Sequence, residues 1–552
     1  MTDSIKKIGI DLDNTIISYD DVFQLAANKF GLLDNNNCLS KESLRNQIRN
    51  QKNGEKKWQK LQGYVYGEGI NEAVLFPGVY RFLWRCKERK IDVEIVSHKT
   101  EFGHFDSKKI SLRDSATNFL INHGLLDNKN PLIKKVTYKN SKKEKIDYIK
   151  QNNYECFIDD LEEIIFSEEL EGQKGILFSR DNLSVKNSNN VIAQSWEEIS
   201  QSVLGNWSLD EVKNMANLIS NNTEVESIEK LKGRGNSAIY KLHLSNANKS
   251  ALKIYPEISY HDRLGSEFKS TKIFKELNIN NVQRPISFDS SLGIATYEWI
   301  EGERISSYGI KELKAALSFL SILHQNSKAE QFKNFPMASD ACPKGSDIEI
   351  QIKRRLLQFD ELSTKYSDLE QFLKNDFKPL FKEIISWSQA SWPSSSSYIV
   401  PIEKNELILS PSDFGFHNAL YSQNGSLTFH DFEYFGWDDP VKLIVDFSLH
   451  PGMNLNENLL RKWFQGTFKI YGKKLLPKLL AAWPLYALCW VLIYLNEFLP
   501  DVWRRRILAD PSKLNEKELV LEKQLSASKR LLSVIKNNYE RNSIIGASEI
   551  YV

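Results

Sequence analysis

Two aspartates and an asparagine in residues 407–440 are spaced in a way that suits phosphoryl transfer. An apolar run typical of a strand ends at a Ser/Pro turn, after which come Asp413 and, five residues later, Asn418. A second strand-like run, 426–429, leads to Asp431. Transfer from a nucleotide needs a carboxylate that orients the attacking hydroxyl and oxygen ligands that hold magnesium on the phosphates. The pattern predicts a catalytic Asp413 and magnesium ligands at Asn418 and Asp431.

Polar side chains also follow a series of strand-like runs near the start of the chain. Apolar runs typical of buried parallel strands lie at 6–12, 91–97, 155–160 and 175–179, with helix-patterned segments between them. Ligands of such sheets bind beyond the carboxyl ends of the strands. The residues expected to converge there are Asp11, Asp13, Ser97, Asp159 and Asp160. Four carboxylates this close repel one another unless a divalent cation or a positive side chain neutralises them.

This arrangement resembles the haloacid dehalogenase-like (HAD) phosphohydrolases over about residues 5–200. The resemblance implies that Asp11 attacks phosphorus and forms an aspartyl-phosphate, while Asp13 protonates the leaving alcohol and later activates water. Ser97 would hold the phosphoryl oxygens. The implied Mg²⁺ ligands are Asp11, Asp159 and Asp160, and Asp13 is counted with them.

The same resemblance calls for a lysine that steadies the nucleophile. We predict Lys142, because it stands four residues before Ile146 at the start of an amphipathic helix, and Lys143 remains an alternative. The rest of the lysine-dense run 134–145 is interpreted as a solvated face. Residues between about 18 and 80 are polar and helical in pattern, which fits a small helical cap over the site.

A second series of residues extends the motif around Asp413. Gly233 and Gly235 form a glycine-rich turn, Lys253 follows eighteen residues after Gly235, and Glu267 lies in the next helix-patterned segment. With Asp413 and the residues after it, the series resembles the aminoglycoside phosphotransferase (APH) and choline kinase family. The match departs from the family's His-Gly before the aspartate, where this chain has Pro411-Ser412.

The kinase resemblance implies roles for these residues. Gly233, Gly235 and Lys253 would bind the phosphates of ATP, and Glu267 would fix the lysine. Glu298 and Ile300 lie where the family places its backbone against the adenine. The expected fold is therefore an α/β doubly wound parallel sheet with a helical cap, joined to an α+β two-lobed kinase-like domain. The expected boundaries are 1–205 for the HAD-like domain, 206–225 for a linker, 226–302 for the N-lobe and 303–552 for the C-lobe.

Composition narrows the partners and the compartment. The 73 basic and 71 acidic residues give a net charge of +2, so nothing favours nucleic acid as a partner. Five cysteines without C-x-x-C spacing fit a reduced, cytoplasmic protein. The apolar stretch 481–495 is shorter than the roughly 20 residues that span a bilayer, so we expect a buried helix and no membrane partner.

These patterns together predict a bifunctional enzyme that acts on small metabolites. One half would hydrolyse a phosphate monoester with Mg²⁺, and the other would phosphorylate a hydroxyl of a sugar, polyol or amino alcohol with ATP and Mg²⁺. An alternative is an active phosphatase joined to a catalytically silent kinase-like module that binds substrate. A kinase directed at a protein or an antibiotic is a third reading. The sequence names neither substrate and does not indicate the oligomeric state.

Overall fold

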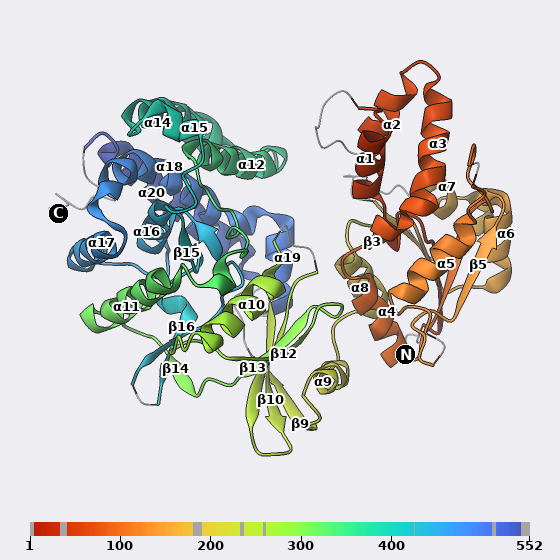
Figure 1. Cartoon of the computed structure of the whole chain (residues 1–552), viewed down its shortest axis with the longest axis horizontal. Helices are drawn as coiled ribbons and strands as arrows, with labels where there is room; N and C mark the ends of the chain where they lie inside the picture. Colours follow the sequence, from red (N-terminus) through yellow and green to blue (C-terminus); the bar gives the residue numbers. More distant parts are fainter. Residues whose placement is uncertain are drawn as a thin grey trace. The chain divides into compact units, whose positions relative to one another are not determined.

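The structure is a computed structural model of the chain, and it describes residues 5–33, 41–106, 108–127, 129–179, 190–231, 237–257, 261–423, 425–509 and 515–541. It divides into two compact units (Figure 1). Unit 1 is Met1–Met215 with Ser291–Gly293, and unit 2 is Ala216–Ser290 with Ile294–Val552. The division lies inside the segment 206–225 assigned to the linker, and half of that segment is the helix α9 (Leu209–Leu218).

Unit 1 is built on a six-stranded parallel sheet in the order β5-β4-β1-β6-β7-β8. Its strands are β1 (Lys7–Ile10), β4 (Asp92–His98), β5 (Lys135–Lys139), β6 (Cys156–Asp159), β7 (Gly175–Phe178) and β8 (Val191–Ala193). The four expected apolar runs hold β1, β4, β6 and β7. The two edge strands, β5 and β8, were not predicted, and β5 lies in the lysine-dense run interpreted as a solvated face.

Helices cover both faces of this sheet because alternate strand residues point to opposite sides. Ile10 and Ile158 pack with α4 (Val79–Glu88), α5 (Leu112–Asn122) and α8 (Trp196–Leu204). Phe157 and Leu177, the alternate residues, pack with α6 (Lys142–Asn152) and α7 (Glu162–Ile165) on the other face. The sheet is thus the middle of three layers, as expected for a doubly wound domain.

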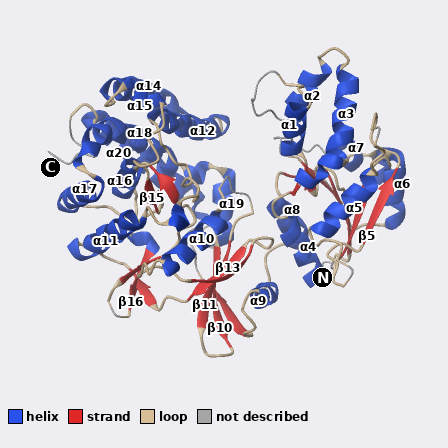
Figure 2. Ribbon diagram, in the orientation of Figure 1, coloured by secondary structure: helices blue, strands red, loops and turns tan. Residues whose placement is uncertain are grey.

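A small helical insertion follows the first strand. Its elements are β2 (Ile17–Ser18), α1 (Asp20–Lys29), α2 (Lys41–Arg49), α3 (Gly54–Tyr66), a 3-10 turn at Glu68–Glu72 and β3 (Val74–Leu75). The rings of Phe23 and Trp58 stack with centroids 5.2 Å apart and join α1 to α3, the helices that stand beside one another in Figure 2. The insertion occupies the place in the chain that was assigned to the cap.

Unit 2 begins with a five-stranded antiparallel sheet in the order β12-β13-β11-β10-β9. Its elements are β9 (Val225–Lys230), β10 (Ala238–Leu244), β11 (Lys249–Ile254), β12 (Pro285–Asp289), β13 (Ile294–Glu298) and the helix α10 (Arg263–Glu276). Two short sheets follow. They are formed by β14 (Gly302–Arg304), β16 (Ala419–Ser422) and β17 (Leu427–Phe429), and by β15 (Ile408–Ser410) and β18 (Gly436–Asp438).

Helices make up most of the remainder of unit 2. They are α11 (Ile310–Asn326), α12 (Gly345–Ser363), α13 (Ser367–Gln371) with a π-turn at Phe372–Phe377, α14 (Lys378–Ser391), α15 (Ser395–Ile399), α16 (Pro440–Leu449), α17 (Glu457–Tyr471), α18 (Leu476–Tyr494), α19 (Pro500–Ala509) and α20 (Lys517–Asn538). In the described part of the chain one stretch, Lys473–Phe498, is long and apolar enough to cross a membrane. Inside the fold 78% of its apolar window is buried, with α18 packed against α12, α14, α16 and α20, as in the core helix of a folded unit.

Candidate active sites

The carboxylates of unit 1 meet where three neighbouring strands end. Ile10 of β1 pairs with Ile95 of β4 and with Ile158 of β6, so the residues that follow these positions are neighbours. The backbone N–H of Asp11 donates to the carbonyl of Ile158 at 2.8 Å, which fixes the first carboxylate at the sheet edge. Ser97 lies buried near the end of β4.

Three of these carboxylates form one compact cluster. Oxygen atoms of Asp11, Asp159 and Asp160 lie within 4.8 Å of one another. Burial, with the charges of the other aspartates, raises the pKa of Asp11 well above its ordinary value and the pKa of Asp160 to about 7. Their ionised forms therefore need positive charge nearby, and oxygen ligands at this spacing suit a hard divalent cation.

The lysine that serves this cluster is Lys145. Its ammonium is buried and lies 2.5 Å from Oδ1 of Asp11 and 2.6 Å from Oδ2 of Asp159. Burial alone lowers the pKa of Lys145, but the two facing carboxylates outweigh it and raise the pKa above its ordinary value. The lysine is therefore charged.

The prediction of Lys142, and the alternative Lys143, is corrected by this geometry. Lys142 is the first residue of α6, and its half-exposed side chain pairs with Glu163. Side chains tilt toward the N-terminus of a helix, so the residue one turn later reaches the strand ends. Lys145 and Ile149 are four residues apart and lie on the buried face of α6, and this helical spacing is the sequence pattern that points to Lys145.

Asp13 contacts a second polar group, formed by the helical insertion and the loop after β4. The Tyr19 hydroxyl donates to Oδ1 of Asp13 at 2.7 Å, and the buried Lys99 ammonium lies 2.8 Å from Oδ2. Lys41 of α2 donates to the side-chain oxygen of Asn14 at 2.8 Å. Neither the contact of Lys99 nor that of Lys41 was predicted from the sequence.

In unit 2 a lysine also sits among carboxylates. The buried Lys253 ammonium on β11 lies 2.7 Å from Glu267 of α10, 2.6 Å from Asp431 and 3.0 Å from Glu433. Burial lowers the pKa of Lys253, yet the three carboxylates outweigh it and raise the pKa well above its ordinary value. Lys253 thus contacts its predicted partner Glu267 and also Asp431, which lies 164 residues after Glu267 in the chain.

The loop that carries Asp413 follows β15 directly. Ser412 adopts a left-handed backbone conformation with φ of 65°, and a 3-10 turn, Phe416–Asn418, closes the loop. The side-chain N–H of Asn418 donates to the Asp413 carbonyl at 2.9 Å, so the asparagine oxygen is the atom that can bind a cation. Ala419 pairs with Phe429, and this register brings Asn418 beside the segment that holds Asp431.

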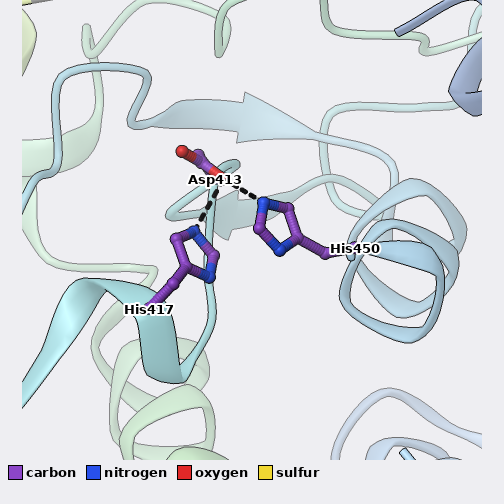
Figure 3. A group of neighbouring side chains, drawn as sticks. All are labelled: Asp413, His417 and His450. Atoms are coloured by element: carbon purple, nitrogen blue, oxygen red, sulfur yellow. Dashed lines mark hydrogen bonds and ion pairs between the residues drawn. The ribbon is translucent and has the colours of Figure 1, made fainter. Parts of the chain in front are cut away.

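Two histidines that the sequence analysis did not single out face Asp413 (Figure 3). Nε2 of His417 lies 3.1 Å, and Nε2 of His450 3.7 Å, from the same oxygen, Oδ1. Enclosure by the fold raises the pKa of Asp413, but the hydrogen bond from His417 and the charges of both imidazoles outweigh it, and the pKa falls to about 2. Burial lowers the pKa of His450 to about 4. At neutral pH, Asp413 is thus ionised and His450 neutral.

The remaining predicted cofactor residues are placed in part. Gly233 and Gly235 lie outside the described residues. Glu298 is exposed and ends β13, and its backbone N–H donates to the Arg284 carbonyl at 2.9 Å. Ile300 is partly buried in the short connection from β13 to β14. That connection leaves the five-stranded sheet and enters the sheet that also contains β16.

No family model and no curated protein matches this sequence. Among solved structures, the chain is similar to a spectinomycin phosphotransferase in complex with ADP and spectinomycin, with 12% identity, a TM-score of 0.42, and coverage of 59% of this chain and 98% of that one. A choline kinase from Streptococcus pneumoniae shares 15% identity over 59% of this chain and 98% of its own, with a TM-score of 0.39. An amicoumacin kinase bound to AMP-PNP, calcium and amicoumacin shares 15% identity over 63% of this chain and 98% of its own, with a TM-score of 0.38.

Proposed function

We propose that the chain is a bifunctional phosphoryl-transfer enzyme acting on small metabolites, and that unit 2 is an APH- and choline kinase-like phosphotransferase. The observation that carries the unit 2 assignment is the contact of one buried lysine, Lys253, with Glu267 of α10 and Asp431. A charged lysine there can hold the phosphates of ATP, which supplies the phosphoryl group. Asp413, ionised at neutral pH, can accept the proton of an acceptor hydroxyl, the chemistry expected for a sugar, polyol or amino alcohol.

Unit 1 is proposed to be a HAD-like phosphatase. Lys145 holds Oδ1 of Asp11, and this contact orients the carboxylate for attack on phosphorus. The attack forms an aspartyl-phosphate while Asp13, which accepts hydrogen bonds from Tyr19 and Lys99, serves the leaving alcohol and later the attacking water. Ser97 supplies a hydroxyl for the phosphoryl oxygens.

Magnesium fits the donor sets of both units. In unit 1 the pKa of Asp11 is raised by burial and by the neighbouring charges of Asp159 and Asp160, and a divalent cation would neutralise these carboxylates. In unit 2 Asn418 and the partly exposed Asp431 offer an amide oxygen and a carboxylate. When bound, Mg²⁺ would neutralise phosphate charge and orient the phosphoryl group.

Phosphorus NMR separates the two activities. The full chain is incubated with Mg²⁺, ATP and a panel of sugars, polyols and amino alcohols, and in parallel with their phosphate esters. Asp11→Asn should abolish release of inorganic phosphate from the esters alone, and Asp413→Asn should abolish ATP-dependent transfer alone. Asp360 of α12 forms an exposed ion pair with Lys378, and Asp360→Asn is the matched control. If either site variant removes both activities or neither, the two-site assignment is wrong. Ester hydrolysis without any transfer would favour a silent unit 2.

A further inference from the structure

The loop of Asp413 lacks the His-Gly that precedes the aspartate in the family it resembles, and has Pro411-Ser412 instead. Two other histidines stand against the same carboxylate. His417 lies inside the loop, four residues after Asp413, and His450 follows the last residue of α16 (Figure 3). They come from segments 33 residues apart and converge only through folding.

We propose that His417 and His450 are positioning residues that hold Oδ1 of Asp413 from one side and leave Oδ2 to accept the proton of the acceptor hydroxyl. The proposal rests on the proposed phosphotransferase function of unit 2. The residue that meets the substrate remains Asp413, and the histidines act through it. They hold the aspartate from within the loop and from beyond it.

The first observation is which nitrogen of each histidine ring carries a proton. A carboxylate oxygen accepts hydrogen bonds, so the Nε2 atom of His417, 3.1 Å from Oδ1 of Asp413, is the donor of this contact. In His450 the other ring nitrogen, Nδ1, accepts the backbone N–H of Gly452 at 3.0 Å. Because the neutral ring has one proton, that proton is on Nε2, which faces Asp413. Both rings thus direct an N–H toward the same carboxylate oxygen, His417 at hydrogen-bond distance and His450 from 3.7 Å away.

The second observation is that the two rings are themselves held. They stack with centroids 3.9 Å apart and an angle of 9° between their planes. The Trp490 ring packs edge-on against His450 at 5.3 Å, and its indole N–H donates to Asp446 at 2.8 Å. A Cβ at Gly415 would lie 2.7 Å from Nδ1 of His417, so a glycine is needed beside this ring. These contacts limit the rotation of both histidines, as a positioning role requires.

The same three side chains also have the composition of a transition-metal site, since their ligand atoms lie within 4.8 Å of one another. Coordination through Nε2 of His450 would require that nitrogen to give up its proton. The N–H of Gly452 occupies Nδ1, so the proton has no other ring position without breaking that hydrogen bond. The observed contacts therefore favour a brace by ring N–H groups over metal coordination.

Variants that keep or remove the N–H test the proposal in the full chain. His417→Phe and His450→Phe keep an aromatic ring without a donor, and we expect kcat to fall about 10- to 100-fold for each, because a misplaced catalytic group loses that much. The KM for ATP should stay within about twofold. His450→Gln, whose amide N–H can occupy the place of Nε2, should recover most of the loss. His324→Phe, at the end of α11, is the matched control. Equal activity of the Phe and Gln variants, or a rise in the KM for ATP with kcat unchanged, would overturn the proposal.

A measurement without turnover keeps the inference separate from the proposed function. In the full chain labelled with ¹⁵N-histidine, NMR should show His450 as the Nε2–H tautomer, assigned by its loss in His450→Gln. Asp413→Asn should shift the resonances of both His417 and His450. If no acceptor is phosphorylated by the wild type but these signals appear as expected, the phosphotransferase proposal fails and the brace stands. A His450 ring with its proton on Nδ1, or one that Asp413→Asn leaves unchanged, refutes the brace itself. A loss of the Nε2–H signal on adding Zn²⁺ alone would show a metal site instead.

Discussion

Replacing Lys145 tests the electrostatics of unit 1 most directly. Lys145→Met keeps the length of the side chain and removes its charge. The buried carboxylates of Asp11 and Asp159, now 2.5 and 2.6 Å from the ammonium, would then face each other without a positive partner. Removing one partner of a buried ion pair typically costs about 3–5 kcal/mol, because the remaining charge stays desolvated. We expect that cost for unit 1 in EDTA at neutral pH.

The matched control lies on the same helix. Lys142 pairs with Glu163 at the surface, and an exposed ion pair is worth about 0–1 kcal/mol. Lys142→Met should therefore leave unit 1 close to wild type. In a unit of about 200 residues, each 1 kcal/mol moves the thermal midpoint by about 2–4 °C, so Lys145→Met should lower it by roughly 6–20 °C.

Calorimetry of the full chain measures this difference, because the two units can unfold in separate transitions. Adding Mg²⁺ should return part of the lost stability to Lys145→Met, since a divalent cation can neutralise the same carboxylates. Hydrolysis of phosphate esters should fall about 10²- to 10³-fold in Lys145→Met and stay near wild type in Lys142→Met. Equal behaviour of the two variants would refute the assignment of Lys145 as the lysine of this site.

Three further predictions follow from other parts of the structure. Lys253→Met should lower ATP-dependent transfer about 10²- to 10³-fold and leave ester hydrolysis intact. Lys249, on the same strand, forms an exposed ion pair with Glu301, and Lys249→Met should change neither activity. A coupled assay measures the transfer. Burial raises the pKa of Glu211, but hydrogen bonds from Arg89 and Arg85 outweigh it and lower the pKa to about 2. Because its pKa is lowered, ionised Glu211 stabilises the fold fully above pH 4.5, and this stabilisation is lost as the pH falls toward 2. Glu211→Gln should therefore cost about 3 kcal/mol at pH 7 and make stability depend less on pH between 4.5 and 2. Denaturant titrations at several pH values measure both effects. Gly9→Ala would place a Cβ 2.5 Å from the Phe157 ring, so calorimetry should show unit 1 destabilised by about 1–3 kcal/mol, and an unchanged midpoint would contradict the packing of β1 on β6.

The parts of the fold that the sequence could predict are those with strong local patterns. Four buried strands were recognised because they are short, nearly continuous apolar runs, and the acids that follow them meet since parallel strands end at one sheet edge. The edge strand β5 was missed because its half-exposed residues include lysines, which protect an edge but read as surface. Lys142 was predicted from its position four residues before Ile146 at the start of an amphipathic helix, but the buried face of α6 carries Lys145 and Ile149.

The histidines around Asp413 show a different limit. Neither residue has a local signature, since His417 lies in a loop and His450 just past a helix. What joins them is tertiary: α16 and the Asp413 loop pack so that two rings stack on one carboxylate. The same holds for Lys99 on Asp13, which are 86 residues apart. Pairwise convergence of this kind depends on the packing of whole elements and is not encoded in any short stretch.

Both candidate centres place one buried lysine among acids, and this shared device has a consequence for binding. In unit 1 Lys145 contacts Asp11 and Asp159, and Asp160 completes the cluster of three carboxylates, so the fully ionised cluster keeps a negative excess. In unit 2 Lys253 contacts Glu267, Asp431 and Glu433, and Arg263 contacts Glu433 as well, again with an acidic excess. A phosphate dianion entering either centre alone would meet repulsion, although the lysine offers it a donor. Under the proposed function, a cation that removes the acidic excess would also create the affinity for phosphate, and we propose that each site accepts a metal-bound phosphoryl group rather than a free one.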